Sequence, residues 1–281
     1  MNKWHIVVDL EKCVGCFNCL MACKDEFVDN DWPPYTRKQQ KHDDKWINPV
    51  RHERGTAPRT DVCFVTKMCQ HCENAPCAKA APGAVTKRPD GIVLLDVYKA
   101  KGNKDLVKAC PFGAIQWNEE LKVAQKCTMC AHLLDDGWTE PRCVQACPIR
   151  ALSVVNCSDE DWEGLSNREE LESLYPGKHK PKVRYKNLYR YNKCFIAGAA
   201  AYDDHGVETA ATNARAAIKK DGKTLETMYV DFLGEFKFDK LEPNSGVYTI
   251  EVDMPGFQRA VKEVELGSES PDIGVMMLER D

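Results

Sequence analysis

Four of the fifteen cysteines lie within eleven residues, in the stretch Cys13-Val14-Gly15-Cys16-Phe17-Asn18-Cys19-Leu20-Met21-Ala22-Cys23. The gaps between them are two, two and three residues, a spacing typical of loops that bind an iron–sulfur cluster. Two-residue gaps let a tight loop direct three thiolates at one cubane cluster, while the fourth points away from it. A zinc site uses two Cys-x2-Cys pairs, and this stretch is too crowded for two such pairs. It therefore predicts an iron–sulfur site.

The other cysteines form further groups with short gaps. These groups are Cys69-x2-Cys72-x4-Cys77, Cys110 directly before Pro111, Cys127-x2-Cys130, and Cys143-x3-Cys147. In a reducing compartment such groups indicate metal ligands rather than disulfides. Three cysteines stand outside any group and are expected to be plain buried thiols: Cys63, Cys157 and Cys194.

A short repeat supports the prediction. Cys110-Pro111-Phe112-Gly113-Ala114 and Cys147-Pro148-Ile149-Arg150-Ala151 share the pattern Cys-Pro-x-x-Ala, and an apolar, strand-like stretch follows each. Ala81-Pro82-Gly83-Ala84 resembles the same repeat with alanine in place of cysteine. The chain is therefore expected to contain duplicated ferredoxin-like units with one ligand missing.

In two-cluster ferredoxins the last cysteine of each run ligates the other cluster. The same crossover in this chain predicts three [4Fe–4S] clusters, each bound by its own set of four cysteines. Set 1 is Cys13, Cys16, Cys19 and Cys147; set 2 is Cys127, Cys130, Cys143 and Cys23; set 3 is Cys69, Cys72, Cys77 and Cys110. A fourth cluster would need cysteine at position 81 and three more within residues 97–109, where there are none. The fourth site is therefore expected to be vacant.

Two histidines and three lysines adjoin these cysteines. His71 and His132 are expected near the clusters or at the surface and not as ligands, because cysteines fill all twelve places. Lys12, Lys24 and Lys126 could tune reduction potentials through charge and hydrogen bonds to sulfur, with a solvated side chain as the alternative.

The last 82 residues contain no cysteine and carry 17 acidic against 9 basic residues, so chemistry and charge change near residue 195. We expect an iron–sulfur region over residues 1–195 and a β domain over 196–281. Within the first region we expect unit one at 1–27 and 120–158, unit two at 63–119, and insertions at 28–62 and 159–194. The insertion at 28–62 is expected to be a structureless, partner-covered or solvated loop. In the second insertion, Ser158 is expected to cap a helix.

The tail alternates apolar and polar residues, as in Tyr248, Ile250 and Val252, with turn signals at regular spacing. The expected fold class is α+β: two ferredoxin-like units plus an antiparallel sandwich or barrel of six or seven strands. The tail resembles transthyretin-like or carboxypeptidase-regulatory β modules. A copper site would need His, Cys and Met together, but only His205 and four methionines are present, and we expect these methionines to fill the core.

Other features exclude several classes of protein. The chain has no apolar run of roughly 18 residues, so no membrane span is expected. It begins without a secretory signal, which predicts a cytoplasmic protein. Basic and acidic residues are mixed throughout, so no nucleic-acid partner is expected. We find no nucleotide-binding glycine motif and no acid–base or nucleophile set, so no catalytic site is expected in this chain.

The order of the cysteine groups resembles the iron–sulfur subunits of the dimethyl sulfoxide reductase superfamily of molybdenum enzymes. In those relatives four groups usually bind four clusters, and this chain departs at Ala81 and before Cys110. With this departure, the sequence resembles the small subunits of transhydroxylases, hydroxylases and dehydroxylases that act on polyhydroxylated aromatics. The motifs that carry this likeness are Trp32-Pro33-x-Tyr35-Thr36, His71-Cys72-Glu73-Asn74-Ala75-Pro76-Cys77, the run from Lys126 to Asp136, and the run from Tyr185 to Arg190.

The resemblance implies a heterodimer. A large catalytic subunit would hold molybdenum in bis(molybdopterin guanine dinucleotide), and this chain would carry the clusters as a non-catalytic electron-transfer subunit. A free soluble polyferredoxin is the first alternative, although the long insertions and the cysteine-free tail exceed what a shuttle needs. A zinc-stabilised scaffold is the second alternative.

Overall fold

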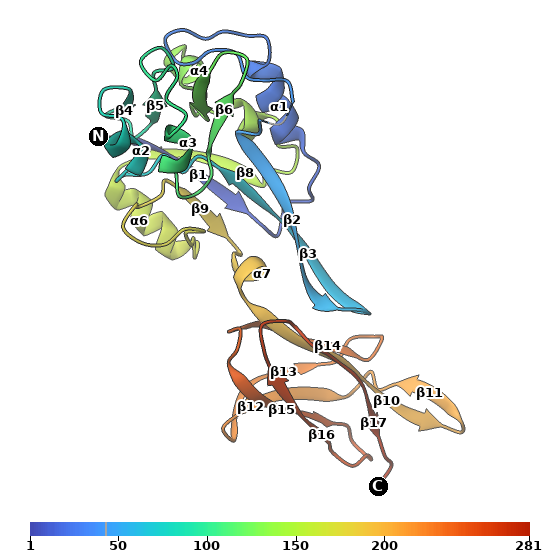
Figure 1. The fold of residues 1–281 in the computed structure, drawn as a ribbon. Coiled ribbons are helices and arrows are strands. Elements are labelled where there is room, and N and C mark those ends of the chain that lie inside the picture. Colours follow the sequence, from blue (N-terminus) through green and yellow to red (C-terminus); the bar gives the residue numbers. More distant parts are fainter. Residues whose placement is uncertain (43) are drawn as a thin grey trace. The chain divides into compact units, whose positions relative to one another are not determined.

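The computed structural model describes residues 1–42 and 44–281 and divides into two compact units (Figure 1). The first unit consists of Met1–Arg51 and Cys63–Leu188, and the second of His52–Val62 and Tyr189–Asp281. The boundary expected after residue 195 falls inside a strand, Cys194–Asp204. The first unit contains every grouped cysteine.

A three-stranded sheet organises the first unit. Strand β1 (Lys3–Asp9) pairs antiparallel with β8 (Leu152–Cys157) and parallel with β9 (Val183–Lys186). The register runs from Lys3 opposite Cys157 to Val8 opposite Leu152. The loop that follows β1 therefore meets the loop that precedes β8, and cysteine groups far apart in the sequence come together.

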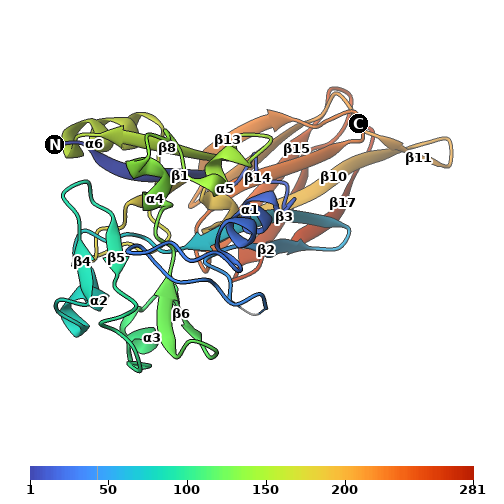
Figure 2. The same ribbon diagram turned by 90° about the horizontal axis from the view of Figure 1, so that it is seen from above.

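Short helices and hairpins complete the first unit. Figure 2 shows α2 beside the β4–β5 hairpin and α3 beside β6. The strands expected after the three repeat copies are confirmed as β4, β6 and β8. The bounds are α1 (Asn18–Phe27), α2 (Pro76–Ala80), β4 (Val85–Lys87), β5 (Val93–Leu95), α3 (Leu106–Ala109), β6 (Ile115–Asn118), β7 (Val123–Lys126), α4 (Ala131–Asp135), α5 (Arg142–Gln145) and α6 (Asp159–Arg168).

The helix cap expected in the second insertion is confirmed. The Ser158 side chain accepts a hydrogen bond from the backbone N–H of Asp161 at 3.1 Å. Three acidic residues occupy the first turn of α6, where they complement the positive end of the helix dipole. The cap and the acidic turn together start α6 directly after β8.

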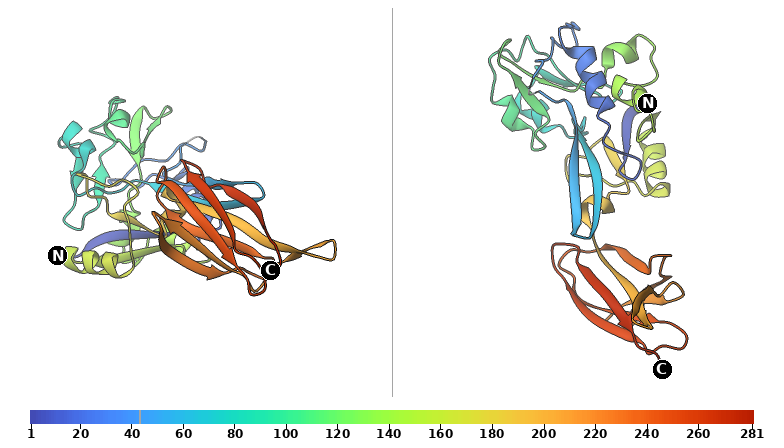
Figure 3. Two further views of the ribbon diagram at one scale, coloured as in Figure 1. Left: turned by 90° about the horizontal axis from the view of Figure 1, so that it is seen from below. Right: turned by 90° about the vertical axis from the view of Figure 1, so that its right-hand side faces the viewer.

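The prediction of a structureless insertion at 28–62 is wrong for its second half. Strands β2 (Ile47–Thr56) and β3 (Arg59–Met68) form a long two-stranded hairpin, visible in the right-hand view of Figure 3. Val, Ile and Thr in this stretch favour extended backbone, but interspersed charges and prolines hide the alternation. The hairpin contributes to both compact units, since the division falls within β2 and β3.

The second unit consists of two four-stranded sheets. One has the order β11-β10-β14 with β17 also paired to β10, and the other has the order β13-β12-β15-β16. Eight strands replace the six or seven expected, and the parallel pairing of β10 with β17 corrects the expected antiparallel arrangement. The bounds are α7 (Tyr189–Asn192), β10 (Cys194–Asp204), β11 (Val207–Ala210), β12 (Arg215–Lys220), β13 (Lys223–Tyr229), β14 (Glu235–Leu241), β15 (Gly246–Asp253), β16 (Ala260–Leu266) and β17 (Asp272–Leu278).

Both sheets of the second unit bury one face in a shared apolar core. The expected alternation is confirmed, since Tyr248, Ile250 and Val252 are all buried there. Of the methionines expected as core fillers, Met276 is buried but Met277 is 46% exposed, because neighbouring strand residues point to opposite faces. The two-sheet core gives this unit its own hydrophobic stabilisation.

A buried ion-pair network fixes the hairpin tip within the second unit. The Arg54 guanidinium on β2 pairs with Asp61 on β3 at 2.8 Å and with Asp239 on β14 at 2.6 Å. Arg190 of α7 also pairs with Asp61. Although burial alone raises the pKa of Asp61, hydrogen bonds from Arg190 and Arg54 bring it down to about 2.

This network predicts acid sensitivity of the second unit. Because the folded-state pKa of Asp61, about 2, lies below the ordinary value of 3.8, its carboxylate stabilises the fold fully above about pH 4. That contribution, about 2 kcal/mol, is lost as the pH falls from about 4 towards 2. Hydrogen exchange of β14 peptides between pH 5 and pH 3 checks this, and Asp61→Asn should weaken the dependence. An equal dependence in both proteins would contradict it.

Candidate iron–sulfur centres

The cysteines of set 1 line one cavity in the first unit. Cys13 and Cys16 lie in the loop after β1, Cys19 lies on α1, and Cys147 precedes β8. The cavity has an apolar lining that includes Val8 and Leu152. The β1–β8 pairing brings Cys147 to the other three cysteines. The site is therefore four thiols around an apolar hollow.

The electrostatics of set 1 require a cationic occupant if the thiols are to ionise. Burial, and after it the nearby thiols of Cys13 and Cys147, together raise the pKa of Cys19 to about 12. Several thiolates in one apolar hollow repel one another unless a positively charged metal core binds them. This chemistry fits an iron–sulfur cluster.

The cysteines of set 3 line a second cavity. Cys69 and Cys72 flank a tight turn after β3, Cys77 lies on α2, and Cys110 follows α3. Burial, and after it the charges of the other three cysteines, together raise the pKa of Cys72 to about 12. The lining also includes His71 and Lys126.

The cysteines of set 2 are buried except for Cys127, which is partly buried. Burial raises the pKa of Cys143 well above the ordinary value, and the thiols of Cys130, Cys127 and Cys23 contribute to the rise. Cys127 and Cys130 contribute in the same way to the raised pKa of Cys23. The four cysteines of set 2 therefore lie near one another, with Cys23 on α1, Cys143 on α5, Cys130 directly before α4 and Cys127 directly after β7.

The three sets adjoin in the order 1, 2, 3. Cys19 of set 1 and Cys23 of set 2 lie one turn apart on the buried face of α1, because residues four apart share a helix face. Sets 2 and 3 adjoin at Cys127 and Cys69. Burial, and after it the Cys69 thiol, together raise the pKa of Cys127 to about 11. Set 2 therefore lies between the other two.

The same local backbone recurs in all three sets. The residue before the second cysteine of each Cys-x2-Cys turn has a left-handed conformation, with φ of 67° at Gly15, 42° at His71 and 56° at Met129. Backbone N–H groups reach the sulfurs of the repeat cysteines, from Ala114 to Cys110 Sγ at 3.4 Å and from Ala151 to Cys147 Sγ at 3.2 Å. Such N–H···S contacts tune cluster potentials.

Ala81, at the position of the missing cysteine, packs into an apolar core. Its neighbours in that core include Val97, Ala100 and Leu106, all buried. Val97 and Ala100 lie between β5 and α3, and Leu106 is the first residue of α3, in the part of the sequence where cysteines for a fourth cluster are absent. Apolar side chains therefore occupy the surroundings of Ala81.

The two cysteine-adjacent histidines differ in their hydrogen bonds. His132 Nε2 bonds Glu26 Oε1 at 2.9 Å, and the ring stacks on Trp32 with centroids 4.3 Å apart. His71 Nδ1 accepts the backbone N–H of Val93 at 3.1 Å. His132 therefore belongs to the packing around α1 and α4, whereas His71 lies in the set 3 cavity.

The three lysines near the cysteines also differ in exposure and in hydrogen bonding. Lys12 is exposed, as the solvated alternative expects, and the Lys24 amine donates to Gln40 O at 2.7 Å. Lys126 is 3% exposed, donates to the carbonyls of Val93 and Cys127, and opposes the burial that raises the pKa of Cys77. Its charge therefore faces set 3.

Sequence reasoning missed Thr66 on β3. This side chain is 1% exposed and lines the set 1 cavity, where its hydroxyl donates to Cys13 and lowers a thiol pKa that burial raises. No motif marks it, because it reaches the site only through the β2–β3 hairpin. Of the ungrouped cysteines, Cys63 and Cys194 are buried as expected, whereas Cys157 is only partly buried.

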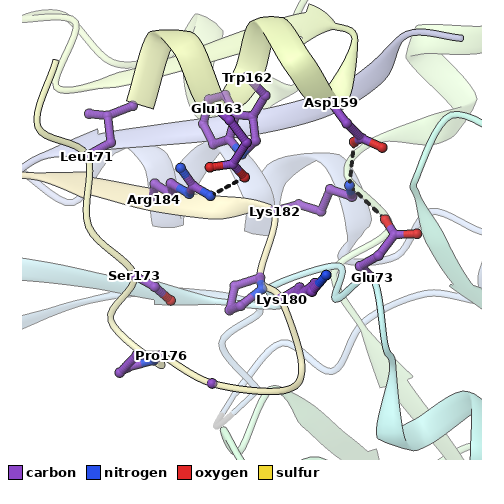
Figure 4. A pocket seen from close by; sticks show the side chains of 12 residues that line it. Glu73, Asp159, Trp162, Glu163, Leu171, Ser173, Pro176, Lys180, Lys182 and Arg184 are labelled. Atoms are coloured by element: carbon purple, nitrogen blue, oxygen red, sulfur yellow. Dashed lines mark hydrogen bonds and ion pairs between the residues drawn. The ribbon is translucent and has the colours of Figure 1, made fainter. Parts of the chain in front are cut away.

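A separate charged cleft lies beside set 3 in the first unit (Figure 4). The Lys182 amine pairs with Glu73 at 2.8 Å and with Asp159 at 3.4 Å, and Arg184 pairs with Glu163 at 2.6 Å. The cationic and carboxylate side chains of the cleft thus form ion pairs with one another. Glu73 follows Cys72 directly, so these pairs connect set 3 to α6.

Two further features are absent from residues 1–42 and 44–281. No three His, Cys, Asp or Glu side chains there are close enough together to bind a single metal ion, and the cysteines of sets 1 and 3 instead line cavities. No helix in the same range has the length and apolar character to cross a membrane.

Comparison with known proteins agrees with the cysteine sites. Residues 60–157 match the family model of a 4Fe-4S dicluster domain. The pyrogallol hydroxytransferase small subunit of Pelobacter acidigallici is 42% identical over 99% of this chain and 100% of its own length. One subunit of the sulfite dehydrogenase of Allochromatium vinosum is 37% identical over 58% of this chain and 72% of its own. The electron transfer subunit of the thiosulfate reductase of Salmonella typhi is 36% identical over 60% and 84%.

The fold, the cysteine sites and these similarities define an iron–sulfur protein. The chain belongs to the iron–sulfur subunits of the dimethyl sulfoxide reductase superfamily of molybdenum enzymes, which confirms the resemblance of its cysteine pattern. Its similarity to the pyrogallol hydroxytransferase small subunit extends over both compact units.

Proposed function

We propose that this chain is the electron-transfer subunit of a heterodimeric molybdopterin enzyme and holds three [4Fe–4S] clusters. The observation that carries the proposal is the pair of cavities lined by four cysteines each, with a third cysteine group between them. Each cluster, when bound, accepts and releases one electron at a time. A row of three adjoining sites then forms a path through the first unit.

The ligand assignment follows the crossover. Cys13, Cys16, Cys19 and Cys147 hold the first cluster; Cys127, Cys130, Cys143 and Cys23 hold the second; Cys69, Cys72, Cys77 and Cys110 hold the third. The apolar packing of Ala81 supports a vacant fourth site, because those side chains fill space that a cluster would need. The chain itself holds no catalytic group in this proposal.

The face around set 1 is our candidate for contact with the large subunit. Cys16 is exposed, and exposed apolar side chains lie near it in sequence and on the same cavity: Val14 at 64%, Phe17 at 40%, and Ile149 at 40%. Met21 on α1, at 63%, extends this apolar surface. Water at an apolar surface of this kind is released when a partner covers it, and covering also shields the cluster from solvent.

The whole-length relative supports our proposal for the substrate class. Because the relative named pyrogallol hydroxytransferase matches along its whole length, the partner subunit is proposed to hold molybdenum in bis(molybdopterin guanine dinucleotide) and to act on polyhydroxylated aromatics. A transhydroxylation leaves the net redox state unchanged, whereas a hydroxylation or dehydroxylation exchanges electrons with an outside carrier. Assays of the complex with pyrogallol, resorcinol and catechols separate these reactions.

Size exclusion of the anaerobically purified native protein tests the subunit role. We expect this 31.8 kDa chain to elute with a larger molybdenum-containing chain, and iron to co-elute with both. A lone species of this chain's mass with bound iron would favour a free ferredoxin instead. A colourless preparation that contains zinc and no iron would favour a structural zinc protein.

A further inference from the structure

His71 lines the set 3 cavity and has a buried ring nitrogen without a hydrogen-bond partner among the described residues. The side chain is 1% exposed and lines that cavity together with Cys69 and Cys72. Its Nδ1 accepts the N–H of Val93 at 3.1 Å, so the proton of the neutral ring lies on Nε2. Nε2 is buried and has no partner among the described residues. An unpaired buried donor is costly, which indicates that a missing group completes it.

Strand β5 fixes the tautomer of the ring. The backbone N–H of Val93 donates to His71 Nδ1, and the carbonyl oxygen of Val93 accepts a hydrogen bond from Lys126. The ring thus has one acceptor in use and one free donor.

The equivalent turns of the other sets lack such a donor. Gly15 and Met129 occupy the same left-handed position before the second cysteine, and neither side chain carries an N–H group. His71 is therefore the one residue of the three that brings a hydrogen-bond donor to this position of the turn.

We propose that His71 Nε2–H donates a hydrogen bond to the iron–sulfur cluster of set 3 and raises its reduction potential. This inference rests on the proposed function, because it requires a cluster held by Cys69, Cys72, Cys77 and Cys110. Reduction adds one electron to the cluster, and the donor stabilises the added negative charge while the proton stays on Nε2. His71 is therefore a positioning and tuning residue and not a ligand.

Two substitutions separate the donor from a structural role. His71→Met installs the residue found at the equivalent position 129 and removes the donor, whereas His71→Gln keeps an amide N–H near the Nε2 position. Neither keeps the ring nitrogen that accepts from Val93, so a merely structural role would affect both alike. In potentiometric EPR titrations of the anaerobic complex, we expect His71→Met to lower one midpoint potential and leave the others unchanged. His71→Gln should stay near the wild type.

The outcomes distinguish this inference from the proposed function. An unchanged potential in His71→Met with the cluster retained, or equal shifts in both variants, would overturn the inference. If the wild-type complex shows no signal that Cys72→Ala abolishes, the proposed cluster in set 3 fails instead. Should His71→Met lose the cluster, electron–nuclear double resonance of the wild type with isotope-labelled histidine decides. We expect a ring-nitrogen coupling that His71→Gln lacks, and its absence in the wild type overturns the inference.

Discussion

Replacing Cys147 with alanine is expected to remove the cluster bound by Cys13, Cys16 and Cys19, which lie more than a hundred residues earlier in the sequence. The reason is the β1–β8 pairing, which places Cys147 in the cavity that those three cysteines line. A four-iron cluster that loses one thiolate in a buried site converts to a three-iron form or is lost. The iron content should fall and one EPR signal should disappear or change.

The control for this experiment is Cys157→Ala. Cys157 lies ten residues further on, at the end of β8, outside all three sets and partly buried. We expect this variant to keep the wild-type iron content and all EPR signals. If Cys147→Ala instead abolished the signal that Cys130→Ala abolishes, the crossover assignment would be wrong.

Replacing Arg54 with methionine is expected to destabilise the second unit by about 3 to 5 kcal/mol. The Arg54 side chain is 6% exposed and pairs with Asp61 and Asp239. Methionine keeps the apolar part of the side chain but leaves two nearby carboxylates without their shared cation. Hydrogen exchange of β14 peptides measures the loss for this unit alone, which suits a chain of two compact units.

Arg259 provides a matched control in the same unit. It also pairs with two acids, Glu251 and Asp253, but its side chain is 54% exposed. Exposed ion pairs contribute little to stability, so Arg259→Met should change exchange protection little. Equal losses in the two variants would show that burial does not decide the contribution of these arginines.

The sequence predicted the local features of the iron–sulfur region well because they depend on short-range chemistry. Cysteine spacing predicted which thiols share a site, and the cysteines grouped as set 1 and as set 3 do line common cavities. Their role as ligands stays a prediction. The Cys-Pro-x-x-Ala repeats predicted strands that follow each copy, and the Ser158 cap predicted the start of α6.

Features that depend on distant partners were not predictable in the same way. The β2–β3 hairpin was mistaken for a loop, and the parallel pairing of β10 with β17 joins the first and last strands of the second unit. Alternation shows that a strand has a buried face but not which strand lies beside it. Lys126 and Thr66 are buried beside the cysteine cavities because of how distant strands pair, so no sequence motif predicts their burial.

Native mass spectrometry of the anaerobic complex tests the central claim most directly, because it counts subunits and bound clusters together. We expect one copy of this chain with one large molybdenum subunit, and three [4Fe–4S] clusters, about twelve iron atoms, on this chain. Two or four clusters on this chain, zinc in place of iron, or a cluster-bearing chain without a partner would contradict the account.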